Sequence, residues 1–214
     1  LGNDINGTMS EYLVGAIANE LTLNAAQAAI ATVDLSFVGC DVEHRTGLEG
    51  LKTGSRPALV ATDAFNTTDN FSRIKLSLVD PATANVQPLF AFCTDLTLTI
   101  NNNVTPNKAI GILGAFDTTA GTFEVGGELT AYFADVAGPK AVRANSDATI
   151  DYVLIKGNAG IVWDMPLIAL GNGAIQIEAD QPIVLPLETN AAESKFGHTL
   201  LMQTFNYLPS IASA

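Results

Sequence analysis

The amino-acid sequence predicts an all-β fold with one short helix. Apolar and polar residues alternate with a period of two in many short runs, which is typical of strands that bury one face. Gly, Asn, Asp and Pro separate these runs, and helical periodicity is scarce. The chain has 214 residues, of which 48% are apolar, so it is long enough to build a packed core. We therefore expect a single β domain over residues 1–214.

The predicted strands are the segments in which this alternation is sustained. In TVDLSFV, for example, Val33, Leu35 and Phe37 project to one face and the polar residues to the other. The apolar face is expected to be core and the polar face to be solvated. The predicted strands cover residues 16–24, 31–42, 71–79, 95–101, 122–134, 149–156, 161–170, 183–189 and 198–206.

One short helix is predicted at residues 139–146. Pro139 suits the first helical position, because its fixed φ angle matches the first turn and no hydrogen bond is lost there. Residues 10–18 allow a second helical interpretation, in which Ser10 is the cap. Gly15 and the alternation that follows it argue against this second helix.

Residues 43–70, between the second and third predicted strands, show no sustained periodicity and are rich in Gly and Pro. Connections this long inside compact domains are usually functional or disordered. The segment is therefore either a contact arm or a flexible insertion. For an arm, the candidate contact residues are Gly47, Leu48, Leu51, Lys52, Arg56 and Phe65.

A weak internal repeat indicates two similar strand pairs in one architecture. NELTLN at residues 19–24 resembles TDLTLT at residues 94–99, and VDLSFV at residues 33–38 resembles GELTAY at residues 127–132. The alignment brings acidic residues into equivalent places on the polar strand faces. The matched residues are Glu20 with Asp95, and Asp34 with Glu128.

The net charge is −12, from 22 acidic and 10 basic residues. A groove that binds DNA needs clustered Lys or Arg to displace counterions from the phosphates, and the sequence has no such cluster. The composition therefore argues against nucleic-acid binding. No apolar run reaches the roughly 18 residues that a membrane span requires, so no membrane insertion is predicted.

The sequence carries no recognisable catalytic or cofactor signature. Phosphate-binding, dinucleotide-binding, zinc-protease, nucleophile-elbow and EF-hand motifs are all absent from it. Cys40 and Cys93 lack metal-ligand spacing and are expected to be reduced, small apolar residues. Trp163 is expected to be a core residue or an interface anchor. The sequence thus predicts a protein that is not an enzyme and has no metal or cofactor.

Four stretches of the chain resemble the tail tube proteins of long-tailed double-stranded DNA bacteriophages. Members of that family typically show a strand ending in NNN, a following pattern with Pro and AIG, a V-x-G-x-L-T-x-Y-F strand, and a DQ step into a late strand. The matching stretches are ANELTLNAAQAAIATVDLSFVGCDVE (18–43), TDLTLTINNNVTPNKAIGILGAF (94–116), GTFEVGGELTAYFAD (121–135) and GIVWDMPLIALGNGAIQIEADQPIVLPLE (160–188).

The resemblance implies a β-sandwich or partly closed barrel that assembles into hexameric rings with a continuous inner β-barrel. The rings would stack into the tail tube of the virion, assembled in the host cytoplasm, through which double-stranded DNA passes during ejection. It also implies tape-measure and tail terminator or tip proteins as partners. Family members usually carry further residues ahead of the segment matching GNDINGTMSE, so the chain is expected to be the C-terminal part of a longer subunit.

Two functional expectations combine the resemblance with the residues. Acidic side chains in the lumen would let DNA slide without binding, and the candidates are Glu20, Asp34, Asp95 and Glu128. Residues 43–70 would form a ring-stacking arm. The competing interpretations are a capsid-decorating or pilus-like subunit, which would share the β-fold and self-assembly, and a β-sandwich that binds carbohydrate.

Overall fold

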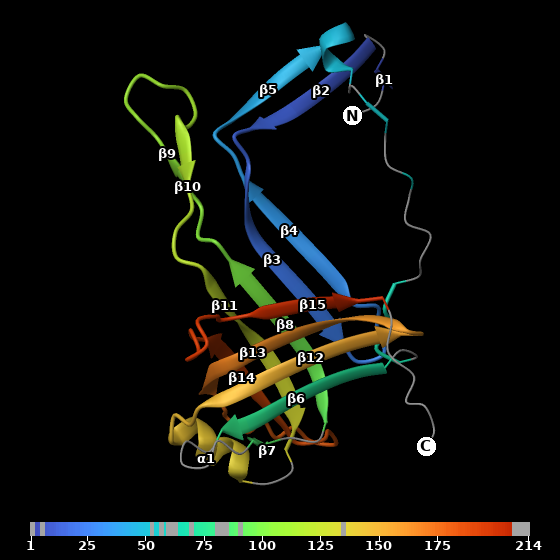
Figure 1. Cartoon of the computed structure of the whole chain (residues 1–214), viewed down its shortest axis with the longest axis vertical. Helices are drawn as coiled ribbons and strands as arrows, with labels where there is room; N and C mark the ends of the chain where they lie inside the picture. The colour runs from blue at the N-terminus through green and yellow to red at the C-terminus, as the bar shows by residue number, and fades with distance from the viewer. Residues whose placement is uncertain are drawn as a thin grey trace. The chain divides into compact units, whose positions relative to one another are not determined.

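Strands dominate the structure, a computed structural model, and one short helix accompanies them (Figure 1). This confirms the predicted mainly β class. The structure describes residues 3–4, 7–51, 54–55, 58, 64–68, 71–79, 86–89, 92–133 and 136–206. Its elements are β1 (Asn3–Asp4), β2 (Gly7–Val14), β3 (Ile17–Ala26), β4 (Thr32–Val38), β5 (Asp41–Thr46), the 3-10 helix η1 (Gly47–Gly50), β6 (Phe71–Val79), β7 (Val86–Pro88), β8 (Cys93–Asn101), β9 (Thr105–Asn107), β10 (Asp117–Thr119), β11 (Glu124–Tyr132), α1 (Ala137–Arg143), β12 (Ala148–Lys156), β13 (Ala159–Asn172), β14 (Val184–Ala191) and β15 (Leu201–Phe205).

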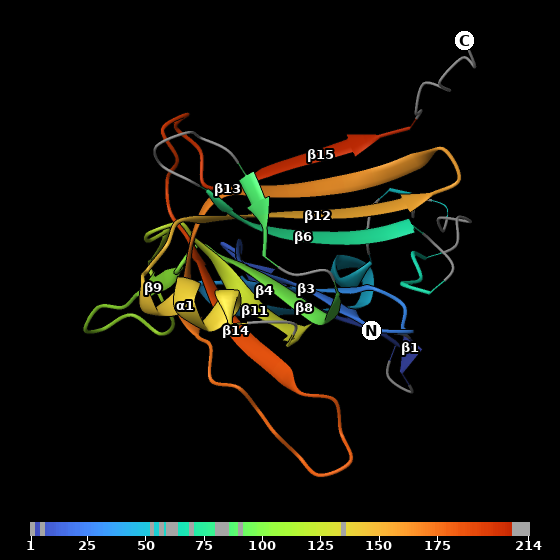
Figure 2. The same cartoon turned by 90° about the horizontal axis from the view of Figure 1, so that it is seen from below.

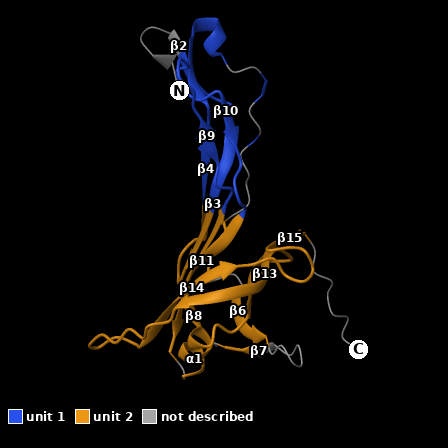
Figure 3. Ribbon diagram, turned by 90° about the vertical axis from the view of Figure 1, so that its left-hand side faces the viewer, with its two compact units in different colours: residues 1–21, 34–63, 101–123 blue, residues 22–33, 64–100, 124–214 orange. Residues whose placement is uncertain are grey.

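The chain forms two compact units (Figure 3). Unit 1 comprises residues 1–21, 34–63 and 101–123, and unit 2 comprises residues 22–33, 64–100 and 124–214. The expectation that residues 1–214 make a single domain stays a prediction.

One large sheet provides the framework of unit 2. Its strand order is β4-β3-β8-β11-β14-β13-β12-β6-β7, and β15 pairs with β13. The sheet curls into a half-barrel, in which β6, β12 and β13 form one layer and β8 and β11 the other (Figure 2). The long strand β13 connects the layers, because its residues 159–168 pair with β12 and its residues 168–172 pair with β14.

The core of unit 2 lies on the inward side of these strands. Period-two alternation explains it, because every second residue of β12 is buried from Ala148 to Leu154. Tyr152 and Trp163 stack with ring centroids 5.5 Å apart, and Trp163 is 6% exposed. Of the two expectations for Trp163, the core position is therefore the one that the structure shows.

The predicted helix is present and begins two residues earlier than expected, at Ala137. Gly138 and Ala141 are its buried residues. Lys140 and Arg143 lie in the last turn, where positive charge interacts favourably with the helix dipole. No helix within the described ranges is both long and apolar enough to cross a membrane.

Unit 1 contains two antiparallel ribbons, the three-stranded β1-β2-β5 and the two-stranded β9-β10. The helical alternative for residues 10–18 is wrong, because residues 7–14 form β2. The predicted strand 31–42 is in fact two strands, because the chain leaves β4 after Val38 and the Cys40 amide donates to the Val14 carbonyl (2.8 Å). The aperiodic segment also starts later than predicted, since residues 43–46 belong to β5 and residues 47–50 to η1.

A carboxyl pair lies on the outward side of the β6–β12–β13 layer. Asp151 is directly opposite both Asp164 on β13 and Lys75 on β6, and His198 is also near Asp164. Burial raises the pKa of Asp164 to about 6, and a hydrogen bond to Asp151 and repulsion by its carboxylate add to this, although His198 acts in the opposite direction. The folded chain therefore keeps a proton on Asp164 at pH values where the unfolded chain has released it.

We predict that this proton makes the free energy of unfolding fall as the pH rises from about 4 to about 7. Because Asp164 is only partly buried, the loss is expected to be about 1 kcal/mol after solvent screening. Asp164→Asn should remove it, so the variant gains stability relative to wild type as the pH rises. Urea unfolding across this pH range tests the difference, with the exposed Asp147→Asn as the control. Parallel pH curves for wild type and Asp164→Asn would contradict the prediction.

Candidate functional site

A polar, acidic surface covers the outward side of β3, β8, β11 and β14 in unit 2. Alternate residues of these strands, such as Leu96 and Leu129, are buried, and the residues between them lie on the other side. On that side the Thr97 hydroxyl donates to Asn24 Oδ1 (3.3 Å). We call this surface the polar sheet face. Its residues are Thr22, Asn24, Asp95, Thr97, Thr99, Gly126, Glu128, Thr130, Glu188 and Asn190.

Charge is distributed unevenly among the strands of the large sheet. β3, β4, β8, β11 and β14 contain no Lys or Arg, whereas Arg73, Lys75 and Lys156 lie on β6 and β12. Phosphate groups are attracted to proteins mainly by Lys and Arg. The side chains of the polar sheet face therefore offer hydrogen-bonding groups and negative charge, but no cation for a phosphate. The acidic residues of β3, β4, β8, β11 and β14 are Glu20, Asp34, Asp95, Glu124, Glu128 and Glu188. β7, β13 and β15 also lack Lys and Arg.

Two of these carboxylates oppose each other directly. Glu128 on β11 pairs with Glu188 on β14, and both side chains are exposed. Like charges in directly opposed positions destabilise a sheet, by roughly 0.2–1 kcal/mol. The pair therefore does not contribute to the stability of the isolated fold. Sequence reasoning missed Glu188, because the alternation in LPLETNA marks it as outward but only the strand register brings it to Glu128.

The four acidic candidates occupy equivalent strands of the repeat. In the sheet order β4 lies beside β3, and β8 lies beside β11. Asp95 and Glu128 are exposed on the polar sheet face of unit 2. Glu20 and Asp34 belong to unit 1, where Glu20 accepts a hydrogen bond from Asn101 Nδ2 (3.4 Å) and Asp34 is exposed. Whether the four line a lumen stays a prediction.

The other side of β4 differs from expectation. Val33, Leu35 and Phe37 were expected to be core, but each is more than half exposed, at 52%, 56% and 56%. β4 is the first strand of the large sheet, and no described residue shields this row of side chains. The alternation correctly predicted a two-faced strand. Alternation does not tell whether the same chain covers the apolar face.

The large sheet has open edges. β4 is at one end of the order and the three-residue strand β7 is at the other, and each pairs on one side only among the described strands. β15 is a third such strand, because its only described partner is β13. An open strand presents unpaired amides and carbonyls, which form a ready template for another chain. The exposed apolar row on β4 favours contact with another chain at this end of the sheet.

The candidate arm is described in part. Leu48 and Leu51 are exposed, Gly47 begins η1, and Phe65 is partly buried. The Phe65 carbonyl accepts a hydrogen bond from the Ala31 amide (3.1 Å). Lys52 and Arg56 lie outside the described residues. The role of the segment in contacts between copies stays a prediction.

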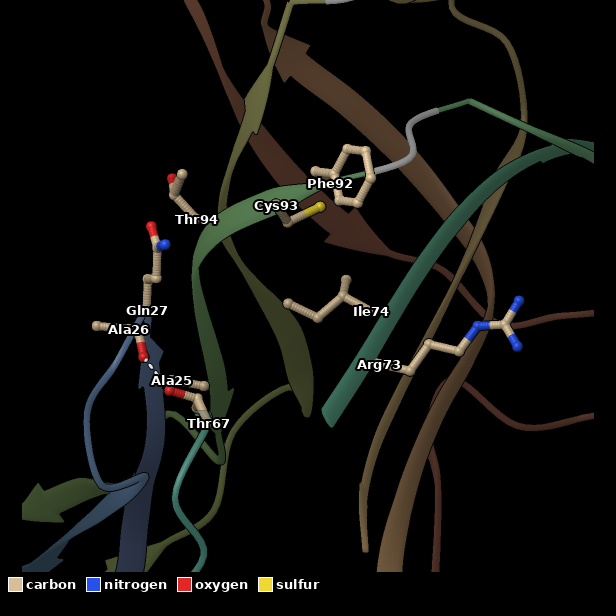
Figure 4. Close-up of a pocket in the computed structure, with 9 residues that line it drawn as sticks. All are labelled: Ala25, Ala26, Gln27, Thr67, Arg73, Ile74, Phe92, Cys93 and Thr94. Atoms are coloured by element: carbon tan, nitrogen blue, oxygen red, sulfur yellow. Dashed lines mark hydrogen bonds between the residues drawn. The ribbon is translucent and has the colours of Figure 1, made fainter. Parts of the chain in front are cut away.

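A hollow of about 320 Å³ lies in unit 2 (Figure 4). Ala25, Ile74 and Phe92 give it apolar walls, and the Arg73 side chain points away from Ile74. Burial raises the pKa of its Cys93 thiol to about 11, so the thiol is protonated at neutral pH and is a poor nucleophile. The described residues also contain no group of three His, Cys, Asp or Glu side chains that could hold a metal ion.

Curated proteins gave no significant match. The family model described as "Phage tail tube protein" matches residues 2–191, which is most of the 214 residues. A mainly β chain with exposed sheet ends and uncovered apolar side chains is consistent with a subunit of an assembly. The chain belongs to the phage tail tube protein family.

Proposed function

We propose that copies of this chain join through the open ends of the large sheet into hexameric rings, and that the polar sheet face lines the lumen of the stacked tube. Family membership gives the chain a structural role in the virion tail and assembly with itself into a tube. The uneven charge of the sheet is the observation that carries the proposal for the lumen.

An acidic lumen suits the passage of DNA. A wall without Lys or Arg releases no condensed counterions from the phosphates, so bound DNA gains no free energy from it. Thr and Asn side chains keep such a wall hydrated, since their hydroxyl and amide groups hydrogen-bond water. The opposed Glu128 and Glu188 fit this role, because they cost stability in the subunit and add negative potential to the wall.

The joining of copies resolves two features that the isolated chain leaves open. Pairing of β4 with the β6–β7 end of the next copy would satisfy the unpaired backbone groups of both strands. The same contact would cover Val33, Leu35 and Phe37, whose burial stabilises a joint by roughly 25 cal/mol per Å² of apolar area. A head-to-tail contact of this kind closes into a ring when the rotation between copies permits.

Stacking of rings is assigned to residues 43–70, with Leu48 and Leu51 as the exposed apolar residues of the arm. Tape-measure protein inside the tube and terminator or tip proteins at its ends are the further partners. Assembly would take place in the host cytoplasm, and DNA would pass through the finished tube during ejection.

Electron microscopy of tubes assembled from the purified chain tests the proposal. We expect rings of six copies, with Glu20, Asp34, Asp95 and Glu128 on the lumen wall and β4 beside the β6–β7 end of its neighbour. The same maps show whether Leu48 and Leu51 lie between rings. A tube with the four carboxylates on its outer surface would refute the lumen assignment, and one in which β4 stays unpaired would refute the joint.

A further inference from the structure

The loop between β9 and β10 exposes several large apolar side chains to solvent. Residues 108–116 read KAIGILGAF and contain one charged residue, Lys108. Ile110 and Leu113 are almost fully accessible, at 107% and 93%, and Ile112 and Phe116 are more than half exposed. We call residues 108–116 the apolar tip loop.

The base of this loop is firmly attached, although its tip is uncovered. The Ala115 amide donates to the Cys40 carbonyl (2.8 Å), and the Phe116 amide donates to the Asn107 carbonyl (2.9 Å). Gly114 has φ +84°, and a Cβ there would lie 3.0 Å from the Cys40 carbonyl oxygen, so this close approach requires glycine. The C-terminal end of the loop is thus anchored to the turn between β4 and β5.

An exposed apolar loop of this size is suited to binding. Four large apolar side chains expose together on the order of a few hundred Å², the size at which a patch on a monomer usually marks a contact site. No described residue of unit 1 covers Ile110 or Leu113, so the partner must be sought outside that unit.

We propose that the apolar tip loop packs against a second copy of this chain within the tube. This inference rests on the proposed function, because family membership makes identical copies the partners that are always present. The copy itself offers other uncovered apolar side chains, among them Ile177 and Phe196, which are 75% and 71% exposed. A nucleic acid would require more cations than Lys108, and a membrane-binding loop would normally carry several basic residues.

The test compares two double variants with wild type. Ile110→Ser/Leu113→Ser removes the apolar tip, whereas Ile110→Leu/Leu113→Ile keeps its apolar area as the matched control. Sedimentation gives the protein concentration at which tubes begin to form. We expect that concentration to rise by roughly 100-fold in the serine variant and to change less than about 3-fold in the control. Circular dichroism should be the same for all three proteins, because both side chains are exposed.

A photoreactive benzoylphenylalanine in place of Leu113 gives a second readout. On irradiation of tubes we expect covalent dimers and higher multimers, with peptides of a second copy attached to position 113. The contact would be overturned if the serine variant formed tubes at the same concentration as wild type. It would also be overturned if irradiated tubes contained crosslinks only within one chain. Either outcome would leave the tube proposal intact. A wild-type chain that stays monomeric at every concentration would overturn both.

Discussion

Gly127→Ala is expected to prevent stable folding of the large sheet. Gly127 lies on β11 with φ +155°, and an added Cβ would be 1.8 Å from the Thr97 carbonyl oxygen and 3.2 Å from Leu98 Cα. These are backbone atoms of β8, so they cannot move aside without separating β8 from β11. We expect a loss of about 4 kcal/mol or more in the free energy of unfolding, a large share of the total stability of a domain.

Urea unfolding followed by the fluorescence of Trp163 measures this loss. Gly157→Ala is the matched control, because Gly157 also has positive φ (+61°) but no atom lies within 4 Å of its added Cβ. The control should lose about 1 kcal/mol, from the backbone conformation alone. Equal losses in the two variants would show that the close approach of β11 to β8 does not limit the fold. Tube formation should fail in Gly127→Ala, since the large sheet that joins the copies in our proposal would not form.

Reversing the charge of the polar sheet face should convert a DNA-repelling tube into a DNA-binding one. In Glu128→Lys/Glu188→Lys the opposed acids become opposed bases, so the pair keeps its mutual repulsion and the fold is little affected. A lumen lined by two Lys per subunit releases counterions from the phosphates. We expect duplex DNA to sediment with these tubes in about 50 mM salt, with an affinity lower by a factor on the order of 1,000 in about 200 mM salt.

The control changes the net charge equally at another place. Asp147 and Glu193 are exposed acids of unit 2 outside the polar sheet face, so Asp147→Lys/Glu193→Lys also moves the charge of the chain by four. Tubes of this variant and of wild type should leave short duplex DNA in the supernatant. If tubes of both charge-reversed variants retain DNA to the same extent, the net charge of the chain explains the binding. The polar sheet face would then not be the surface that meets the DNA.

Much of the fold follows from local alternation. The strand predicted at residues 71–79 coincides with β6, because Ile74, Leu76 and Leu78 alternate with Arg73, Lys75 and Ser77 in its sequence. Strands of two or three residues, such as β1, β7, β9 and β10, are too short to show a period. β2 was missed for another reason. Its partner β5 holds it through backbone hydrogen bonds, and both sides of the ribbon are largely accessible, so no apolar face marks it.

The candidate site was predictable only in part, because it depends on pairing between distant strands. Composition and the repeat identified Asp95 and Glu128 as equivalents of Glu20 and Asp34. Only the register of β11 with β14 reveals Glu188 as the neighbour of Glu128. The exposed row on β4 could not be predicted, since alternation shows that a face is apolar but not whether its own chain covers it.

The small number of buried residues in unit 1 has a consequence for how a tube grows. Among its described residues only Gly50, Val104 and Ala115 are buried, so its ribbons have almost no core of their own. Isolated two-stranded ribbons are marginally stable in water, and segments with few buried contacts open at low free-energy cost. The arriving subunit is then expected to order its ribbons fully only when a neighbour covers them. Each addition to the tube end is in this sense partly a folding reaction, with the preceding copy as its template.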